Sequence, residues 1–335
     1  MNSPVTLKQL AELLKLAPST VSRALKGHPD INPVTQEKVR AMAQQLHYRP
    51  NALASSLRKR KSHVIALIVP DIKNYYYSCV ISSVVYFAYV RGYKVCLFES
   101  REEYNREVDI CRFLQKSGVD GLIITPAKNT VESEHLQKLQ KEGIVLFLLD
   151  RILGDIDADR ALSDDYHGAY LIVNQMIDAG FQKIAHLTLS QKLLWAQKRE
   201  MGYIQALLDH HIEIDRSVII EYTDLTEIEQ ITRHLIEHSR VDGIFAINDE
   251  CAVKVLMSVH RAGKMVPGDI AVCGFGNDPM SEVTCPPLTT LDRNCDKIGK
   301  LAVDFLIDRI EGKSKGETVT KLLKGRLIVR ESTMK

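Results

Sequence analysis

Short apolar runs alternate with helix-length stretches from residue 64 to residue 275, and this alternation limits the fold more than any other feature. Apolar runs predict strands over 64–69, 95–98, 121–124, 144–149, 184–187, 218–221, 243–247 and 270–275. The stretches between them predict helices over 78–91, 103–117, 131–141, 166–179, 196–210, 226–239 and 249–262. Strands that alternate with helices are typical of parallel sheets covered by helices on both faces. The sequence therefore predicts an α/β body whose strands are buried on both sides.

The number of these units predicts two lobes rather than one large sheet. We expect a first lobe over 64–160 and a second lobe over 161–289. A helix over 293–311 would return to the first lobe, so we assign 290–318 to the first lobe and 319–335 to the second. Residues 1–50 then form a separate head, and residues 51–63 form a hinge helix and basic linker.

The head has the signals of three short helices. Thr6 is a helix cap, and Gln9 three residues later completes a capping box. Pro18 follows a tight turn at the first position of a second helix, and Asn32 caps a third. Two helices joined by such a turn are typical of a helix-turn-helix, whose second helix enters the DNA major groove. One row of that helix faces outward: Ser19, Thr20, Ser22 and Arg23.

Charge separates the head from the body. Residues 1–63 contain 11 Lys and Arg against 3 Asp and Glu, whereas the remaining residues contain 33 against 39. A basic module attached to a mildly acidic body indicates a polyanion as the partner of the head. The competing interpretation is a protein-docking module whose hydroxyl row is a solvated face.

Three segments of the head and hinge resemble the lactose-repressor (LacI/GalR) family of bacterial transcription regulators. They are Val5-Thr6-Leu7, Ser19-Thr20-Val21-Ser22-Arg23-Ala24-Leu25 and Tyr48-Arg49-Pro50-Asn51-Ala52-Leu53-Ala54-Ser55-Ser56-Leu57-Arg58. The resemblance implies a hinge helix over 51–58 that orders on DNA, with Leu57 as a wedge in the minor groove. It implies these DNA-binding residues: Thr6, Ser19, Thr20, Ser22, Arg23, Asn51, Ala54, Leu57 and Arg58.

Two residues depart from the family pattern. The family usually has Gly in the turn, where this chain has Lys15, and Ser as the cap before the second helix, where it has Ala17. A residue other than Gly at positive φ costs roughly 1 kcal/mol, and Ala is a poor helix cap. These departures put the family's phosphate contact at position 17 in doubt.

The body resembles the two-lobed body of the same family, which is similar to periplasmic sugar-binding proteins. The resemblance implies a ligand in the cleft between the lobes, on loops at the carboxyl ends of the strands. Aromatic rings, amides and a guanidinium on those loops suit a sugar or other polyol. The expected effector-binding residues are Asp71, Tyr76, Tyr77, Asp164, Trp195, Arg199, Asn248 and Asn277.

Several of these residues have a second interpretation. Tyr76 and Tyr77 could instead cover a helix of the dimer, and Trp195 could be plain packing. Asp164 is either a cleft residue or a loop cap. Gly276 stands where the family usually has an Asp that binds effector, so either Asn277 replaces that Asp or the ligand differs. We interpret Asp150-Arg151 as a structural ion pair.

One enzyme-like motif is present. His234-Leu235-Ile236-Glu237-His238 matches the H-x-x-E-H zinc-protease pattern, but the sequence offers no third metal ligand. Two histidines on a solvated helix edge are the simpler interpretation, because short motifs match often by chance. We expect no enzyme activity, no metal and no cofactor.

The sequence thus predicts a ligand-controlled transcription regulator, most simply a repressor. We expect a homodimer on a palindromic operator in double-stranded DNA, with a sugar as effector. Seven scattered cysteines and the lack of a signal peptide or an 18-residue apolar run favour a cytoplasmic protein with no membrane partner. The rivals are a cytoplasmic sugar-binding protein with a protein-docking head, and a zinc hydrolase using His234, Glu237 and His238.

Overall fold

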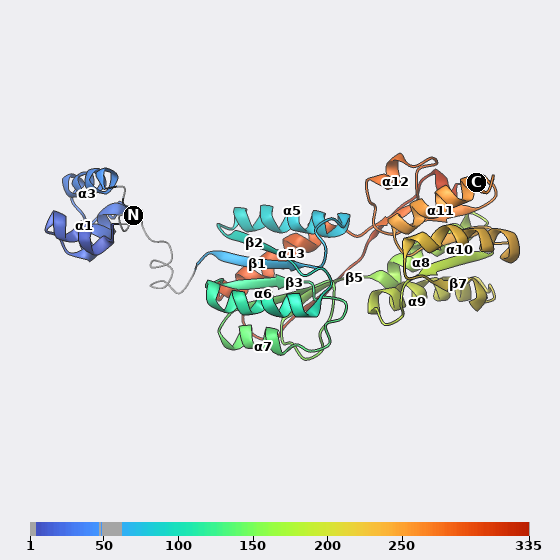
Figure 1. The fold of residues 1–335 in the computed structure, drawn as a ribbon, viewed down its shortest axis with the longest axis horizontal. Helices are drawn as coiled ribbons and strands as arrows, with labels where there is room; N and C mark the ends of the chain where they lie inside the picture. Colours follow the sequence, from blue (N-terminus) through green and yellow to red (C-terminus); the bar gives the residue numbers. More distant parts are fainter. Residues whose placement is uncertain (1–4, 47, 49–61, 335) are drawn as a thin grey trace. The chain divides into compact units, whose positions relative to one another are not determined.

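The computed structural model describes residues 5–46, 48 and 62–334, and its chain divides into two compact units between residues 62 and 63. The head consists of helices α1 (Leu7–Leu14), α2 (Pro18–Leu25) and α3 (Pro33–Gln45), all drawn in Figure 1. The hinge expected over 51–58 lies outside the described residues. The predicted helix-turn-helix is present in the head.

Local signals at the helix ends of the head behave as the sequence predicts. The Thr6 hydroxyl accepts a hydrogen bond from the Gln9 N–H, and the Gln9 side chain accepts from the Thr6 N–H, which is a capping box. Lys15 ends α1 in the left-handed conformation at φ 53°, without the glycine that favours this turn. Asn32 caps α3 by accepting from the Val34 N–H at 2.9 Å. The core between the helices is small: Leu10, Ala11, Val21, Ala24, Val39 and Ala43.

The first lobe of the body is a parallel sheet of six strands in the order β11-β5-β4-β3-β1-β2. The strands are β1 (Val64–Val69), β2 (Lys94–Glu99), β3 (Gly121–Ile124), β4 (Val145–Leu149), β5 (Asp159–Ser163) and β11 (Thr320–Leu323). Helices α5 (Tyr75–Val90) and α13 (Cys295–Glu311) cover one face, and α6 (Tyr104–Ser117) and α7 (Glu134–Lys141) cover the other (Figure 1). Strand β1 is almost completely buried, because both faces are covered.

The second lobe is a parallel sheet of four strands in the order β7-β6-β8-β9. The strands are β6 (Ile184–Thr188), β7 (Ile219–Glu221), β8 (Gly243–Ala246) and β9 (Ala271–Cys273). Helices α8 (Asp165–Asp178) and α9 (Leu194–Asp209) pack on one face, and α10 (Ile228–His234) and α11 (Asp249–Arg261) on the other. The short helix α12 (Met280–Val283) follows β9. The alternating β-α units predicted from the sequence therefore form two parallel sheets.

Three connections join the lobes. The chain passes from β5 to α8, returns through β10 (Thr290–Asp292), and crosses again after β11 into β12 (Arg326–Ile328). Strands β10 and β12 pair antiparallel, with Leu291 opposite Leu327. The chain ends in a 3₁₀ helix (Glu331–Thr333) packed beside β9 in the second lobe.

The predicted lobe boundaries are wrong in two places. A boundary at residue 160 cuts through β5, which pairs with β4 and belongs to the first sheet. The tail assigned to the second lobe from residue 319 first adds β11 to the first sheet, alongside β5. Both strands carry weak signals, since β11 is an exposed edge and β5 begins with Asp159 and Arg160. Apolar runs alone do not identify such strands.

The predicted helix over 226–239 is divided. It begins with a 3₁₀ turn (Leu225–Glu227), continues as α10 and ends in a π-helical turn (Leu235–Ser239).

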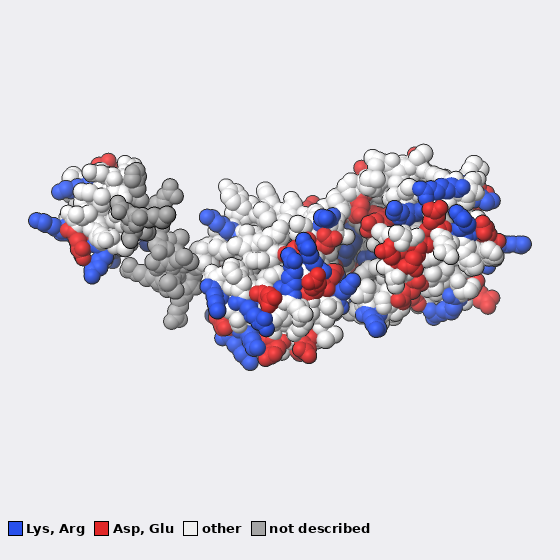
Figure 2. Space-filling view, viewed as in Figure 1, with Lys and Arg blue, Asp and Glu red and all other residues white. Residues whose placement is uncertain are grey.

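Lys, Arg, Asp and Glu side chains lie side by side on the visible face of both lobes (Figure 2). Among the described residues, none of the helices is long and apolar enough to cross a membrane.

Candidate DNA-reading helix and ligand cleft

Helix α2 has one buried side and one open side. Val21 and Ala24 are fully buried against α1 and α3, whereas Ser19 is exposed and Thr20 and Ser22 are half-buried. The hydroxyls of these three residues hydrogen-bond to none of the described residues. Ala17 caps the helix without a side-chain hydrogen bond. The open side therefore offers free hydroxyl donors and acceptors to a partner.

The other head residues differ in how free they are. Arg23 is 59% exposed, and its guanidinium lies 4.0 Å from the Asp30 carboxylate, a weak surface contact that a phosphate or base can replace. Thr6 is exposed, but its hydroxyl already serves the capping box. The remaining expected DNA contacts lie outside the described residues: Asn51, Ala54, Leu57 and Arg58.

The body contains two adjoining cavities at the carboxyl ends of its strands, where parallel sheets usually bind ligands. We call them the inner pocket, of about 210 Å³, and the outer pocket, of about 200 Å³. Asp150, Arg151 and Trp195 line both. The inner pocket is also lined by Asn74, Tyr76, Tyr77, Glu102, Leu189, Arg199, Asn248, Glu250, Phe275, Gly276, Asp278 and Arg293. Each pocket has residues of both lobes in its wall.

On the first lobe, an ion pair and two tyrosines form the wall of the inner pocket. Tyr76 and Tyr77 lie in the first turn of α5 and are 5% and 8% exposed. The Asp150 carboxylate, just after β4, accepts a hydrogen bond from Arg293 at 2.6 Å. The Arg293 guanidinium lies 3.5 Å from the centre of the Tyr76 ring. Burial raises the pKa of Tyr76 well above its usual value, so this hydroxyl stays protonated.

A second ion pair continues the first-lobe wall. Arg151 donates two hydrogen bonds to Glu102, each 2.6 Å long, and a third to the Pro126 carbonyl at 2.7 Å. Asp150 and Arg151 therefore do not pair with each other, contrary to the interpretation from the sequence. Asp150 adopts a left-handed conformation at φ 64°, and each of the two neighbours has a partner from another segment.

On the second lobe, Arg199 of α9 is the central charged group of the wall. Its guanidinium donates to Asp165 at 2.9 and 2.7 Å and to the Ile247 carbonyl at 2.5 Å. It also lies 3.6 Å from the centre of the Phe275 ring and 4.9 Å from that of Trp195. Burial lowers the pKa of this guanidinium, and Asp165 opposes that effect. The side chain is thus held rigidly at the pocket wall.

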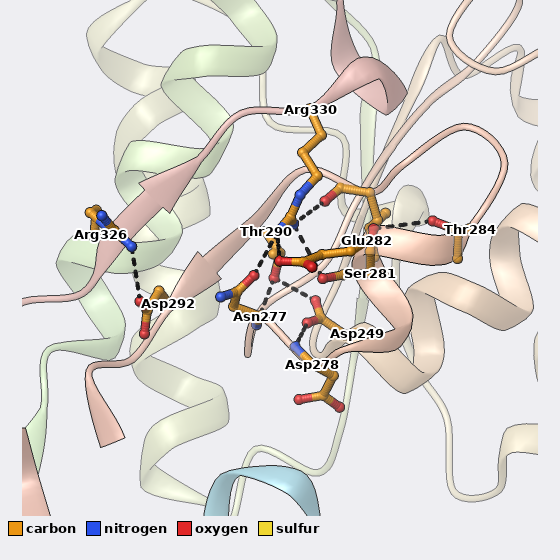
Figure 3. A network of polar contacts seen from close by, with 11 residues as sticks. Asp249, Asn277, Asp278, Ser281, Glu282, Thr284, Thr290, Asp292, Arg326 and Arg330 are labelled. Carbon is orange, nitrogen blue, oxygen red and sulfur yellow. Dashed lines mark hydrogen bonds and ion pairs between the residues drawn. The ribbon is translucent and has the colours of Figure 1, made fainter. Parts of the chain in front are cut away.

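Asn248 and Asp278 complete the second-lobe wall. Asn248 caps α11 by accepting from the Cys251 N–H at 2.8 Å. The Asp278 N–H donates to the buried Asp249 carboxylate at 2.7 Å, and Asp249 also accepts from the Thr290 hydroxyl. Figure 3 shows the Asp278 carboxylate turned away from this network. Burial, together with the charges of Asp249 and Glu250, raises the pKa of Asp278 to about 7.

The structure brings together Tyr76, Tyr77, Trp195, Arg199 and Asn248 of the expected effector residues. The other three do not line either pocket.

The three outlying residues serve the backbone or another side chain. Asp71 is exposed and accepts from the Lys73 N–H, and Asp164 caps α8 by accepting from the His167 N–H. The Asn277 side-chain oxygen accepts from Arg330 at 2.9 Å, as Figure 3 shows, and neither residue lines either pocket. Asn277 lines neither pocket, whereas Gly276 and Asp278 on either side of it line the inner one.

Six charged residues of the inner pocket were not among the effector-binding residues expected from the sequence: Glu102, Asp150, Arg151, Glu250, Asp278 and Arg293. Asp278 lies on the same loop as Asn277, and of the two it is the one that lines the inner pocket. Arg293 follows β10 directly, at the return to the first lobe. A charged residue at such a crossing is a usable signal, because lobe crossings border the cleft.

The H-x-x-E-H motif lies on the surface. The rings of His234 and His238 stack with centres 4.8 Å apart, and both residues are exposed. Among the residues that the structure describes, these histidines are not joined by a third metal-ligating side chain.

Comparison with known proteins finds a matching family for the head and another for most of the body. Residues 6–51 match the family described as "Bacterial regulatory proteins, lacI family", and residues 173–333 match the periplasmic binding protein-like domain. The NTD biosynthesis operon regulator of Bacillus subtilis (strain 168) is 30% identical over 98% of this chain and 99% of its own length. The chain belongs to the LacI family. It is therefore a regulator of transcription and not an enzyme.

Two further LacI-family proteins show how far the likeness extends. The ribose operon repressor of Halalkalibacterium halodurans is 28% identical over 98% of this chain and 97% of its own length. A LacI-family regulator from Enterococcus faecium, solved with bound ribose, is 29% identical, covers 81% of this chain and 98% of its own, and has a TM-score of 0.71. The helix-turn-helix head and the two-lobed body with parallel sheets are thus those of the LacI family.

Proposed function

We propose that this protein is a transcriptional repressor whose homodimer binds a palindromic operator and whose operator affinity is set by a sugar in the cleft. The observation that carries the proposal is the pairing of two sites in one chain. Helix α2 presents free hydroxyls beside an exposed arginine, and the body encloses an aromatic, arginine-lined cavity between two lobes. A head that reads DNA and a body that encloses a small molecule make a ligand-controlled switch.

In this proposal, α2 makes the sequence-specific contact with DNA. Ser19, Ser22 and Arg23 reach base edges in the major groove, and two heads related by a two-fold axis require a palindromic site. The hinge residues 51–58, with Leu57 as the wedge, occupy the minor groove between the half-sites. The basic run 58–61 contacts phosphates and makes the affinity depend on salt.

The proposal of a homodimer is based on an apolar face of α5, which we define as Val85, Tyr86, Tyr89 and Val90. These side chains are 45%, 61%, 79% and 61% exposed. Leu97 on the neighbouring edge strand β2 is also exposed. Contiguous apolar side chains of this kind mark protein interfaces, and Tyr is enriched there. A second copy of the chain covers this face.

The proposal that the ligand is a sugar is based on the side chains that line the inner pocket. Tyr76, Trp195 and Phe275 supply apolar ring faces, and Arg199 and Asn248 supply polar groups around them. The Enterococcus faecium relative of the same family was solved with ribose, which supports a sugar as ligand. The ligand contacts both lobes and favours one arrangement of them. Linkage then requires that operator DNA changes the ligand affinity by the same factor.

Selection of bound sequences from random duplex DNA, at about 0.15 M salt, tests the proposal. We expect one enriched palindrome with a flexible pyrimidine–purine step at its centre, where the wedge kinks the duplex. Arg23→Ala should weaken binding to the selected site about tenfold or more, because a lost base contact costs about 1–3 kcal/mol. Arg112→Ala is the matched control, because Arg112 is an exposed arginine of α6 whose one ion pair with a described residue is with Asp109.

The dimer and the wedge have separate tests. Tyr86→Asp with Tyr89→Asp should give a monomer in analytical ultracentrifugation. In the selection from random DNA, this variant should no longer enrich a palindromic sequence. Leu57→Ala should weaken specific binding and leave the salt-dependent non-specific binding nearly unchanged. Salt-dependent binding without an enriched sequence, with or without sugars, would contradict the operator proposal.

A further inference from the structure

The positively and negatively charged side chains of the inner pocket differ in whether they have a partner of opposite charge. Each of its three arginines already has a carboxylate partner: Arg151 has Glu102, Arg199 has Asp165 and Arg293 has Asp150. These pairs are 2.6–2.7 Å long and largely buried. None of the three cations is therefore left for an anionic ligand to neutralise.

Two carboxylates of the same pocket remain. Asp278 and Glu250 both line it, and neither carboxylate forms a hydrogen bond or ion pair with any described residue. The backbone N–H of Asp278 is engaged with Asp249, which fixes the loop and leaves the carboxylate free (Figure 3). Glu250 is exposed and Asp278 is half-buried, so the unpaired charge of the pocket is negative and its less solvated carboxylate is that of Asp278.

The surroundings of Asp278 disfavour its ionised form. Burial disfavours its negative charge, and the carboxylates of Asp249 and Glu250 on α11 repel it. Arg293 attracts it, but that guanidinium is committed to Asp150. With a pKa of about 7, Asp278 is partly protonated near neutral pH, and its ionised form has no cationic partner among the described residues.

We propose that the inner pocket takes a sugar or related polyol bearing a protonated amine, and that Asp278 binds this ammonium group. The inference rests on the proposed function of the cleft as the effector site. An ammonium is the group that neutralises a carboxylate held near two others, whereas a hydroxyl leaves their mutual repulsion in place. Asp278 is then the specificity-determining residue of the site.

The outer pocket differs in charge from the inner one, so the preference for an amine applies only to the part of the ligand in the inner pocket. Lys128, Lys192 and Lys198 line it, and none of them forms an ion pair with a described residue. An anionic substituent can therefore lie in the outer pocket without approaching Asp278. The amine preference belongs to the inner pocket, and it is measured with ligands that carry no anion.

Matched pairs of monosaccharides test the proposal on the full-length protein: glucose with glucosamine, galactose with galactosamine, and mannose with mannosamine. Binding is followed through the fluorescence of Trp195, the single tryptophan, which lines the pocket. At pH 7 we expect the amine of at least one pair to bind ten or more times more tightly than its hydroxyl partner. Asp278→Asn should remove this difference, and Glu213→Gln, an exposed carboxylate of the second lobe, should keep it.

The pH profile separates an ionic contact from a structural role. An ammonium requires ionised Asp278, so the affinity for the amine should rise from pH 6.0 to 7.5, by up to about eightfold for a pKa near 7. The rise should vanish in Asp278→Asn. A neutral sugar that accepts a hydrogen bond from protonated Asp278 would show the opposite slope.

Several outcomes overturn the proposal. Hydroxyl sugars that bind as tightly as their amines, a flat pH profile, or an Asp278→Asn variant with unchanged selectivity would each do so. A panel in which no amine changes the fluorescence or the melting temperature would overturn the ligand class, and operator selection would still stand. Loss of the palindrome would instead be a failure of the proposed function.

Discussion

The two walls of the ligand cleft differ in how their charges are balanced. On the first-lobe wall both arginines are paired with carboxylates at 2.6 Å. On the second-lobe wall the one arginine is paired, and two further carboxylates, Asp278 and Glu250, pair with none of the residues that the structure describes. Both arginines of the first wall thus have carboxylate partners, whereas the second wall carries a half-buried carboxylate, Asp278, that a cationic ligand or a proton can neutralise.

This difference separates shape from selectivity. A buried ion pair fixes side-chain positions, and removing one partner is costly because the other charge stays buried. An unpaired carboxylate does the reverse, because it weakens the folded protein slightly and offers free energy to a cation that binds it. The paired residues therefore maintain the cavity, and Asp278 selects what enters it.

Replacing Arg199 should have the largest effect on stability. Arg199→Met leaves Asp165, whose side chain is 5% exposed, without a partner, and we expect a loss of about 3–5 kcal/mol in the free energy of unfolding. Urea unfolding followed by Trp195 fluorescence measures it. The ligand response should disappear as well, since the guanidinium lines the inner pocket.

The double variant tests the reason for this loss. Arg199→Met with Asp165→Leu removes both charges, and its stability should recover to within about 2 kcal/mol of the parent protein. A double variant as unstable as the single one would show that packing on Phe275, and not the uncompensated charge, carries the effect.

The first-lobe wall should respond in the same way but more weakly. Arg293→Met leaves Asp150 without its cation, although the Tyr76 hydroxyl remains 3.4 Å away and the cavity admits water. We expect a loss of about 2–3 kcal/mol, measured by urea unfolding. Asp150→Asn in the same background should restore part of it. A loss under 0.5 kcal/mol would mean that this wall does not depend on its ion pair.

Sequence patterns were sufficient for the parts of this fold that depend on local periodicity. Buried strands such as β1 and β8 are continuous apolar runs, and the caps at Thr6 and Asn32 are local signals. Strand β11 was missed because three of its four residues are exposed, so its position is set by pairing with β5 and not by its own composition.

The charged pairs of the cleft could not be predicted from neighbouring residues. Asp150 stands beside Arg151 in the sequence, yet its partner is Arg293, 143 residues away. Adjacent opposite charges look like a pair in any sequence, whereas partners from other segments are fixed only by the crossings of the chain. Asn277 and Asp278 pose the same problem, since the local turn decides which of the two faces the cavity.

The second-lobe wall also depends on close backbone packing at Gly274. A Cβ at this position would lie 2.2 Å from the Asp249 Oδ1 atom and 3.0 Å from its Cα atom. Gly274→Ala should therefore cost about 1–3 kcal/mol and displace the carboxylate that holds the Asp278 N–H. Thermal unfolding measures the cost. Gly154→Ala, where a Cβ meets nothing within 4 Å, should change stability by less than about 0.5 kcal/mol.

Replacing Asp278 should have the smallest effect on stability and an unusual sign. Its pKa of about 7 in the folded protein lies above the value of about 3.9 for an unfolded Asp. The folded state therefore binds the proton more tightly, and the carboxyl group reduces stability as pH rises from about 4 to about 7. Asp278→Asn removes this loss. We expect a gain of roughly 1 kcal/mol at pH 7.5, a modest value because solvent screens a partly exposed group.

The gain should shrink at lower pH. Near pH 4 the wild-type carboxyl is protonated in the folded state, so Asp278→Asn and the parent protein should have nearly equal free energies of unfolding. Urea unfolding at pH 4.5, 6.0 and 7.5 measures this convergence, with Glu213→Gln as the control that shows no such trend. A variant less stable than the parent at pH 7.5 would show that Asp278 has a partner within the folded chain. The contrast between the paired and the unpaired wall would then be lost.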